Sequence, residues 1–439
     1  MVTTLCLRPR SDRRQRILGK AGRWRGRLLY GFGHLGKSLF WYSSELLFAY
    51  FLTEFVGLRA TQMGVVLASG FLVSALIDLS VGVGLARRLT TASSASQLQF
   101  IGAVLCSIAL LAVFLGAWIA PAHRFAYAMA AGGFFRLAFA IYDIPQNALM
   151  ALATGDATAR LRIASTRIWF SGTATLIVAT LIGPLVSRRD DASATQLLLG
   201  VAILFGIVAI VGAWMLHRLL RATVREVPQP SVSEGMRGPW PAAFWWLLLV
   251  MVATSAFTPV FSKLEPYFAA YALGSAWWGG VVIVSMASGI LVGQPVWIRL
   301  CVRMPGGSVM LANALLQIAA LVLFCFSGVA NPAVSAFAAF LFGLRNGGVG
   351  MVQWAAFSET VVRLGTGRTG LGYGLFSAAA KLSFAVGGLL IATALDRIDY
   401  RGGQGADIVP LMASVPIIGA VFCALAGVGL LRRNSLISR

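Results

Sequence analysis

Charged residues are scarce in this chain: Asp, Glu, Lys and Arg make up 12% of its 439 residues. Soluble domains carry about 25% charged residues, so this composition excludes a water-soluble globule of this size. Hydrophobic residues reach 58% and come in blocks, such as residues 97–120, which hold no charge. Because a helix needs about 20 apolar residues to span a membrane, the sequence predicts an all-α polytopic membrane protein.

Histidine and cysteine are also scarce, with three and five residues in the whole chain. The histidines show no HxxxH or HExxH spacing, and the cysteines form no CxxC or Cys/His metal pattern. No P-loop or GxSxG motif opens a helix after a strand. We therefore expect no metal site, no cofactor, no structural disulfide and no catalytic residue. A membrane enzyme and a non-transporting sensor are the alternatives from other functional classes.

The apolar segments number twelve, and they lie at 29–53, 63–86, 97–120, 125–153, 163–186, 197–219, 241–271, 275–300, 308–328, 331–357, 371–395 and 408–431. The one long hydrophilic connector, 220–240, is rich in proline and charge and follows the sixth segment. It predicts two six-helix bundles, 29–219 and 241–431, with cytoplasmic tails at 1–28 and 432–439. This plan resembles that of major facilitator transporters, which bind substrate near the membrane midplane between two such halves.

Basic residues outnumber acidic ones, 36 to 15, giving a net charge of +21. In a soluble protein this excess would suggest nucleic-acid binding. Here the basic residues cluster in the N-terminal tail and in alternate loops, which is typical of cytoplasmic segments of membrane proteins. We therefore expect a monomeric, multi-pass protein of the inner or plasma membrane, with both termini cytoplasmic. Its partners would be membrane lipids and a small-molecule substrate, not nucleic acid.

Charges inside the predicted spans are few. A charge at the centre of a spanning helix costs about 2.5–3.5 kcal/mol on insertion scales, so each should be paired or line a water-filled cavity. The set comprises Lys37, Glu45, Asp78, Arg136, Asp143, Glu265, Arg345 and Lys381, with Arg167 and Glu359 nearer helix ends. We interpret Glu45, Arg136, Glu265, Arg345 and Glu359 as candidate structural or gating charges.

The first span carries polar residues at helical spacing. Lys37, Trp41 and Glu45 are four residues apart and share a face, with Ser38 and Tyr42 beside it. This face predicts the lining of a cavity. The alternatives are a Lys37–Glu45 ion pair within the helix and aromatic side chains that face lipid.

The fourth span carries a carboxylate and an amide four residues apart, Asp143 and Asn147. They share a face of a helix that Pro145 can kink. Together they would make a good acceptor set for sugar hydroxyls. The alternative is a hydrogen-bond network that supports the kink.

Asp78 is the one charged residue in the second span. Desolvation favours the neutral form of a carboxyl, so Asp78 could load and release a proton. The alternative is a structural ion pair with Arg136 or Arg345. Lys381, in the eleventh span, could be the counter-charge to Asp78 or Asp143.

Four stretches resemble the glycoside–pentoside–hexuronide:cation symporters, the group of the melibiose permease. They are residues 30–58, 142–172, 294–303 and 358–388, and they extend over nearly the whole chain in matching order. The resemblance implies a secondary transporter that carries a sugar or glycoside by alternating access. It implies substrate-site positions at Lys37, Ser38, Asp143, Asn147, Arg167 and Lys381. Two of these depart from the family pattern, since Ser38 replaces an aspartate and Asn147 replaces the melibiose permease tryptophan.

The cation site implied by the resemblance is depleted. Ser74 stands where the family has the first of two aspartates, and Asp78 matches the second. Sodium prefers several oxygen ligands, whereas a proton needs one titratable group. We therefore predict proton coupling, or no coupling, over sodium. A different cargo on the same scaffold, such as a lysophospholipid, an amphiphile or a drug-like molecule for export, is the alternative transporter function.

Overall fold

The computed structural model describes residues 23–83, 91–152, 157–187, 192–221, 240–362 and 366–437. Within these ranges all regular secondary structure is helical, and the predicted all-α fold class is confirmed. The first half holds α1 (Arg23–Tyr42), η1 (Ser43–Leu47), α2 (Phe48–Tyr50), η2 (Phe51–Phe55), α3 (Ala60–Val83), α4 (Ala92–Leu115), η4 (Gly116–Trp118), η5 (Pro121–His123), α5 (Arg124–Leu152), α6 (Ala157–Ser187) and α7 (Ala192–Leu220). The second half holds α8 (Ala242–Phe257), α9 (Val260–Tyr267), η6 (Phe268–Ala272), α10 (Ala276–Arg303), α11 (Gly306–Ser327), α12 (Pro332–Leu344), α13 (Asn346–Val362), α14 (Thr366–Arg397), η7 (Gly405–Asp407) and α15 (Ile408–Ile437).

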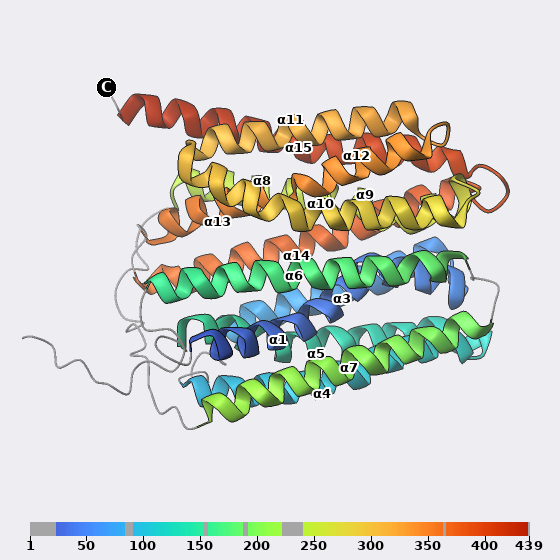
Figure 1. Ribbon diagram of the computed structural model, residues 1–439, viewed down its shortest axis with the longest axis horizontal. Helices are drawn as coiled ribbons and strands as arrows, with labels where there is room; N and C mark the ends of the chain where they lie inside the picture. The colour runs from blue at the N-terminus through green and yellow to red at the C-terminus, as the bar shows by residue number, and fades with distance from the viewer. Residues whose placement is uncertain are drawn as a thin grey trace, which may run out of the picture.

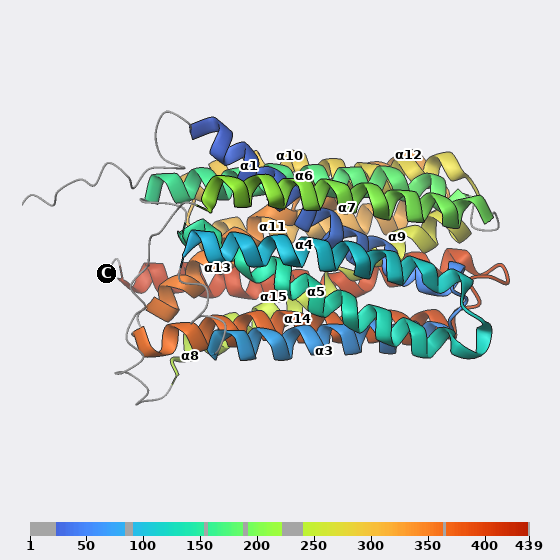
Figure 2. The ribbon, with the colours of Figure 1, turned by 90° about the horizontal axis from the view of Figure 1, so that it is seen from below.

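The long helices run side by side along one axis of the molecule (Figures 1 and 2). In the first half α4 packs on α5 and α7, and α1 packs on α6 and α7. In the second half α10 packs on α12, α11 on α15, and α8 on α14. The pairs α3–α14 and α6–α10 join the two halves. The start of α1 and the end of α15 lie at the same end of the bundle (Figure 1). Most of the predicted basic tail and connector, residues 1–22 and 222–239, lies outside the described residues.

Nine helical segments of the described chain are long and apolar enough to cross a membrane. Three of the twelve predicted ranges, 29–53, 163–186 and 331–357, are helical where described but fall short of that threshold of length and apolarity. All three contribute polar side chains to internal cavities, as described below, but so do ranges 125–153, 241–271 and 371–395, which meet the threshold. The count of twelve spans therefore stays a prediction.

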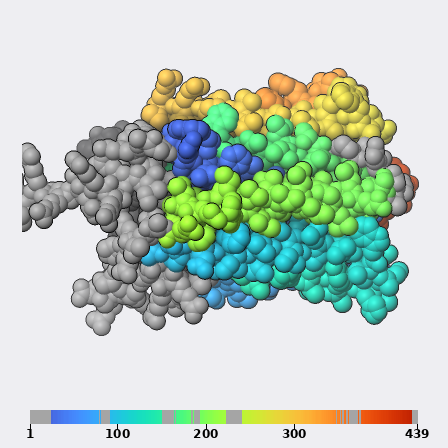
Figure 3. All heavy atoms as spheres, turned by 60° about the horizontal axis from the view of Figure 1, so that its bottom comes forward, coloured from blue at the N-terminus to red at the C-terminus, as the bar shows by residue number. Residues whose placement is uncertain are grey.

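The outer surface of the bundle is apolar along its length. On α7 the exposed side chains Ile203, Leu204, Ile207 and Val211 form one stripe. Figure 3 shows α7 lying on the surface beside α4. Long apolar stripes of this kind are rare on soluble proteins, and they are suited to lipid chains.

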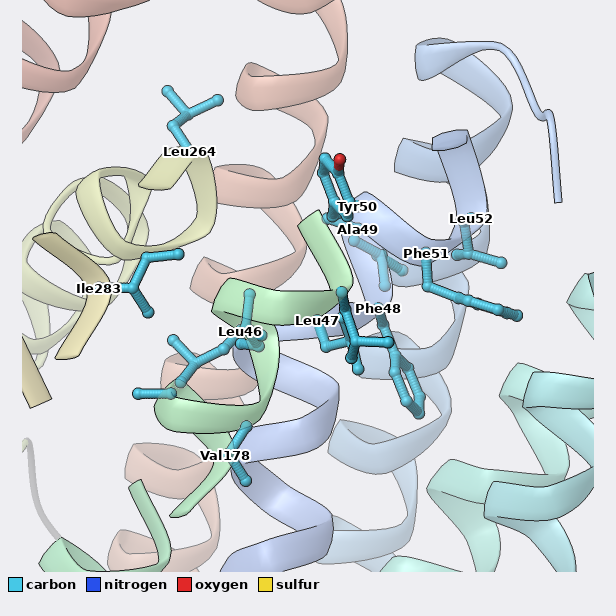
Figure 4. Packing of buried hydrophobic residues seen from close by; sticks show 14 of the residues in the cluster. Leu46, Leu47, Phe48, Ala49, Tyr50, Phe51, Leu52, Val178, Leu264 and Ile283 are labelled. Atoms are coloured by element: carbon cyan, nitrogen blue, oxygen red, sulfur yellow. The ribbon is translucent and has the colours of Figure 1, made fainter. Parts of the chain in front are cut away.

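The first span is not a uniform α-helix. It widens to π-helix at η1 and again at η2, on either side of the short α2. Figure 4 shows apolar side chains from the other half around this stretch, including Leu264 of α9 and Ile283 of α10, with Val178 of α6 also close by. Single π-helical turns are rare and often lie at functional sites. Here they carry the two acidic residues Glu45 and Glu54.

Candidate functional site

One cavity, of about 300 Å³, lies between helices of the two halves. We call it the Asp143 cavity. Its lining comes from α1 (His34, Lys37, Ser38, Trp41, Tyr42), α5 (Phe139, Asp143), α6 (Arg167, Ser171) and α14 (Ser377, Ala380, Lys381, Phe384). Six of the seven predicted substrate residues are among them. The position between the halves and the mixture of charged, hydroxyl and aromatic groups are typical of a small-molecule site.

Lys37 and Asp143 form an ion pair within this cavity. The Lys37 Nζ atom lies 2.6 Å from the Asp143 Oδ1 atom and ties α1 to α5. The carboxylate side chain is 22% exposed. Among the described residues no donor reaches its second oxygen, Oδ2. Asp143 therefore keeps an acceptor available to a bound molecule, while Lys37 holds the carboxylate in place.

Asn147 does not line the cavity, contrary to the predicted acceptor set. Its side chain is exposed, and its Oδ1 atom accepts a hydrogen bond of 2.7 Å from Arg167. Asp143 and Asn147 do share a face, as predicted, but only Asp143 reaches the cavity wall. Asn147 instead positions Arg167, which is a cavity residue.

Aromatic rings form one wall of the Asp143 cavity. The Trp41 ring packs on Phe139, with ring centroids 5.5 Å apart, and on Phe384 at 6.0 Å. The three rings come from α1, α5 and α14, so both halves contribute. Phe139 and Phe384 were not predicted, because single phenylalanines in apolar spans look like ordinary lipid-facing or core residues.

Glu45 lies farther along the first span and is held by two cations. Its Oε2 atom lies 2.8 Å from Lys263 Nζ of α9, and its Oε1 atom lies 3.5 Å from an Arg136 guanidinium nitrogen of α5. The Arg136 guanidinium also stacks over the Phe71 ring at 3.9 Å. These buried charges link the two halves. The alternative of a Lys37–Glu45 pair is not formed, and Arg136 is engaged by Glu45.

Lys263 was not predicted as a site residue. It lies in the same apolar segment as Glu265, and only the acidic residue of the two stood out. Glu265 is buried in α9, where neither carboxyl oxygen has a hydrogen-bond partner among the residues that the structure describes. In α9, therefore, the charged residue with an ion-pair partner among the described residues is Lys263, which pairs with Glu45.

A fourth acidic residue, Glu54, lies at one end of the molecule and contacts residues of both halves. Its carboxylate accepts hydrogen bonds from Tyr400 at 3.0 Å, from Arg401 at 2.8 Å and from Tyr271. We call these four residues the Glu54 cluster. It joins η2 to η6 and to the loop after α14, at the end opposite the chain's C-terminus (Figure 1). No sequence motif signalled it, because its members lie in three separate parts of the chain.

The Glu54 carboxylate also shapes the titration of this loop. Burial alone would lower the pKa of Arg401, but its hydrogen bonds and charge attraction to Glu54 outweigh burial and raise the pKa. Burial, together with the negative charge of Glu54, raises the pKa of Tyr400. Arg401 therefore stays charged and Tyr400 stays neutral at physiological pH, the forms that donate hydrogen bonds to Glu54.

Three predicted site residues, Ser74, Asp78 and Glu359, are not seen at either cavity among the described side chains. Ser74 is buried in α3 and lines neither of the cavities described here. Asp78 and Glu359 belong to α3 and α13, but their side chains lie outside the described part of the structure.

A second cavity, of about 240 Å³, adjoins the first. We call it the Arg345 cavity. It shares the side chains Trp41, Tyr42 and Phe384 with the Asp143 cavity. Its other lining residues are Glu45, Leu46, Thr175, Thr258, Pro259, Ser262, Met286, Ile290, Phe342, Gly343, Arg345 and Asn346. The three helical ranges that lack a strong hydropathy signal thus all contribute polar residues to these two cavities.

An apolar-faced helical bundle with charged cavities between its halves defines a polytopic membrane transporter. Residues 29–435 match the family described as MFS/sugar transport protein, and the chain belongs to that family. It is a secondary transporter, and the family is one of transporters rather than enzymes. The resemblance to glycoside–pentoside–hexuronide symporters is confirmed.

Two relatives from Escherichia coli (strain K12) match most of the chain. The inner membrane symporter YicJ is 23% identical over 408 residues, covering 90% of this chain and 86% of that protein. The glucuronide carrier protein homolog is 22% identical over 421 residues, covering 92% and 91%.

Solved structures share the fold at low identity. A peptide transporter POT in complex with alafosfalin superposes with a TM-score of 0.64 and 14% identity, over 95% of this chain and 96% of that one. A bacterial homologue of the iron transporter ferroportin, in its inward-facing state, superposes with a TM-score of 0.61 and 15% identity. The match covers 94% of this chain and 99% of that one. These likenesses support the major facilitator fold and carry no information about cargo.

Proposed function

We propose that this protein is a proton-coupled symporter of a sugar, a glycoside or a related polar small molecule. The observation that carries the proposal is the Asp143 cavity, which gathers Lys37, Ser38, Trp41, Asp143, Arg167 and Lys381 from four helices. The relatives named as a symporter and as a glucuronide carrier homolog support the same class of cargo. Inner-membrane location, two bundles joined at 220–240, cytoplasmic termini and a monomeric state complete the proposal.

The cavity offers the groups that a polyhydroxylated ligand needs. Asp143 Oδ2 is an acceptor for a hydroxyl proton, and Lys37, Arg167 and Lys381 are donors to hydroxyl or ring oxygens. The aromatic wall of Trp41 and Phe384 provides a flat apolar surface for one face of a sugar ring. Recognition would therefore combine charged hydrogen bonds with ring packing.

Alternating access is the transport mechanism in this proposal. The Glu45 ion pairs and the Glu54 cluster both tie the halves together on the same side of the Asp143 cavity along the first span. This arrangement is suited to a state whose Glu54 end is closed. Rocking of the halves would break these contacts while the ligand stays bound between them.

Coupling is assigned to Asp78 of α3, with Ser74 as a nearby hydroxyl on the same helix. The assignment rests on the sequence, where one carboxylate remains of the family's acidic pair. Replacement of Asp78 by Asn should abolish uphill accumulation in proteoliposomes with a pH gradient while leaving substrate exchange intact. Unchanged accumulation by the variant would remove Asp78 from the coupling role.

The test of substrate class is a ligand panel on purified, detergent-solubilised protein, measured by isothermal titration calorimetry. The panel contains glycosides, free sugars and a lysophospholipid, and each is tested on the wild type, Asp143→Ala and Asp396→Ala. Asp396 is an exposed acid at the end of α14 and serves as the matched control. We expect glycoside binding that Asp143→Ala abolishes and Asp396→Ala keeps. Binding of the lysophospholipid alone would contradict the proposal and favour the amphiphile carrier.

A further inference from the structure

The tenth predicted span is broken at a single residue. Helix α12 ends at Leu344 and α13 begins at Asn346, with Arg345 between them. The indole N–H of Trp297 on α10 donates to the Leu344 carbonyl at 2.6 Å, and the Asn313 amide on α11 donates to the Arg345 carbonyl. Side chains of two neighbouring helices thus donate hydrogen bonds to the carbonyls at the break. The break is therefore stabilised by the tertiary structure.

Close packing holds this break in position. A Cβ atom on Gly289 or Gly293 of α10 would overlap the Phe340 or Leu344 carbonyl of α12. The two backbones are therefore in direct contact along the turn that precedes Arg345. Contact of this kind requires glycine and leaves α12 little freedom to shift. Arg345 and the start of α13 are consequently fixed against the cavity wall.

Arg345 is a buried cation that forms no ion pair with any carboxylate in the described part of the chain. The residue is 5% exposed, and its Nε atom has no hydrogen-bond partner among the described residues. No carboxylate of the described chain forms an ion pair with it, and its guanidinium contacts the Phe342 ring at 4.8 Å. An unpaired charge at this depth is costly. Because Arg345 lines the Arg345 cavity, a bound anion could supply the missing charge.

The rest of this cavity is also suited to an anion. Helix α13 begins at its wall with Asn346, and the first amides of a helix have no acceptor within the helix and carry partial positive charge. Glu45 is the one acidic residue of the described lining, and Lys263 and Arg136 already hold it. The carboxylate in the lining is therefore already balanced, and Arg345 is the one cation among the described lining residues. Broken helices whose N-termini meet the charged part of a substrate are a known device of transporters.

We propose that Arg345 and the N-terminal turn of α13 form an oxyanion site, which binds a carboxylate or phosphate group of the transported molecule. The planar guanidinium matches either group with paired hydrogen bonds. The Asp143 cavity would then hold the neutral part of the same molecule, across the shared wall of Trp41, Tyr42 and Phe384. The placement of a sugar in the Asp143 cavity rests on the proposed function. The placement of an oxyanion at Arg345 rests on the surroundings of Arg345 itself.

The test compares two ligands that differ at one carbon, phenyl β-D-glucuronide and phenyl β-D-glucoside. Their affinities are measured by calorimetry on full-length wild type, Arg345→Met, Arg345→Lys and the control Arg299→Met. Arg299 is an exposed arginine on α10 that lines neither cavity. We expect Arg345→Met to weaken the glucuronide by about 10- to 100-fold and to change the glucoside by less than about twofold. Arg345→Lys should retain part of the glucuronide affinity, and Arg299→Met should retain all of it.

Retained glucoside affinity also shows that Arg345→Met is folded. Equal losses for both ligands, or no loss for the glucuronide, would overturn the oxyanion site. A second arm measures thermal unfolding with glucuronate, glucose 6-phosphate or glucose at equal ionic strength. We expect glucuronate or glucose 6-phosphate to stabilise the wild type more than glucose does, and we expect Arg345→Met to lose this difference. The anion that stabilises the protein shows whether the site binds a carboxylate or a phosphate group. If no glycoside binds but this stabilisation appears, the sugar proposal fails and the oxyanion site stands; its absence overturns the site.

Discussion

Asp143 and Glu45 are both acids between helices, one half-buried and one buried, and their surroundings differ. Glu45 has a cation on each oxygen, and its side chain is 10% exposed. Asp143 has one cation, an open oxygen and 22% exposure, and it faces the larger cavity. A carboxylate with both oxygens paired is suited to holding two halves together, whereas one with a free oxygen is suited to binding a ligand. The number of partners, more than burial, separates the two roles.

The largest expected effect is on stability, at Glu45. Replacement by Gln leaves Lys263 and Arg136 buried without a counter-charge, which should cost about 3–5 kcal/mol of folding free energy. Thermal unfolding of purified protein measures the loss. The double variant Glu45→Gln with Lys263→Met removes one stranded cation and should recover part of the stability. Equal stability of wild type and Glu45→Gln would contradict the structural role.

The second effect is on binding, at Asp143. Asp143→Asn removes the charged acceptor in the cavity, so glycoside affinity should fall by about 10- to 100-fold, corresponding to about 1.5–3 kcal/mol. Its loss of stability should be smaller than that of Glu45→Gln, because Lys37 borders the cavity and can be solvated there. Calorimetry and thermal unfolding on the same preparations compare the two. If the stability ranking is reversed, the contrast between the two acids is wrong.

A smaller effect is expected at Asn147, which positions Arg167 without lining the cavity. Asn147→Ala removes one hydrogen bond to a cavity residue, which corresponds to about 1 kcal/mol or about fivefold in affinity. Asn147→Asp keeps an acceptor and should restore most of the affinity. A loss as large as that of Asp143→Asn would show that Asn147 contacts the ligand directly.

The smallest effect is expected at the Glu54 cluster. Arg401 is half exposed, so its pair with Glu54 contributes at most about 1 kcal/mol, about a fivefold shift between closed and open states of this end. Arg401→Leu should raise the open population. Spin labels on η2 and on the loop after α14 report the distance between them. Unchanged distance distributions in Arg401→Leu, and in Glu54→Gln, would exclude the cluster from closing this end.

The sequence supports the fold and part of the candidate site for a clear reason. Apolar blocks and sparse charges give the membrane class directly, because lipid excludes charge wherever a helix spans it. The face of Lys37, Ser38, Trp41 and Tyr42 follows from helical periodicity within one segment, and all four residues lie at the Asp143 cavity. Lys263, Glu54 and Arg401 escaped prediction, because no spacing within one segment relates them to their partners.

What the sequence alone determined is therefore local: which segments are apolar, which faces carry polar groups, and which family pattern the motifs follow. The tertiary structure decided which charges meet. Glu45 and Lys263 are 218 residues apart, and Lys37 and Asp143 are 106 apart, so several pairings were open until the helices packed. The break at Arg345 is likewise satisfied by Trp297 and Asn313 from two other helices. Pairing across a bundle depends on distances in space, which helical periodicity within one segment does not encode.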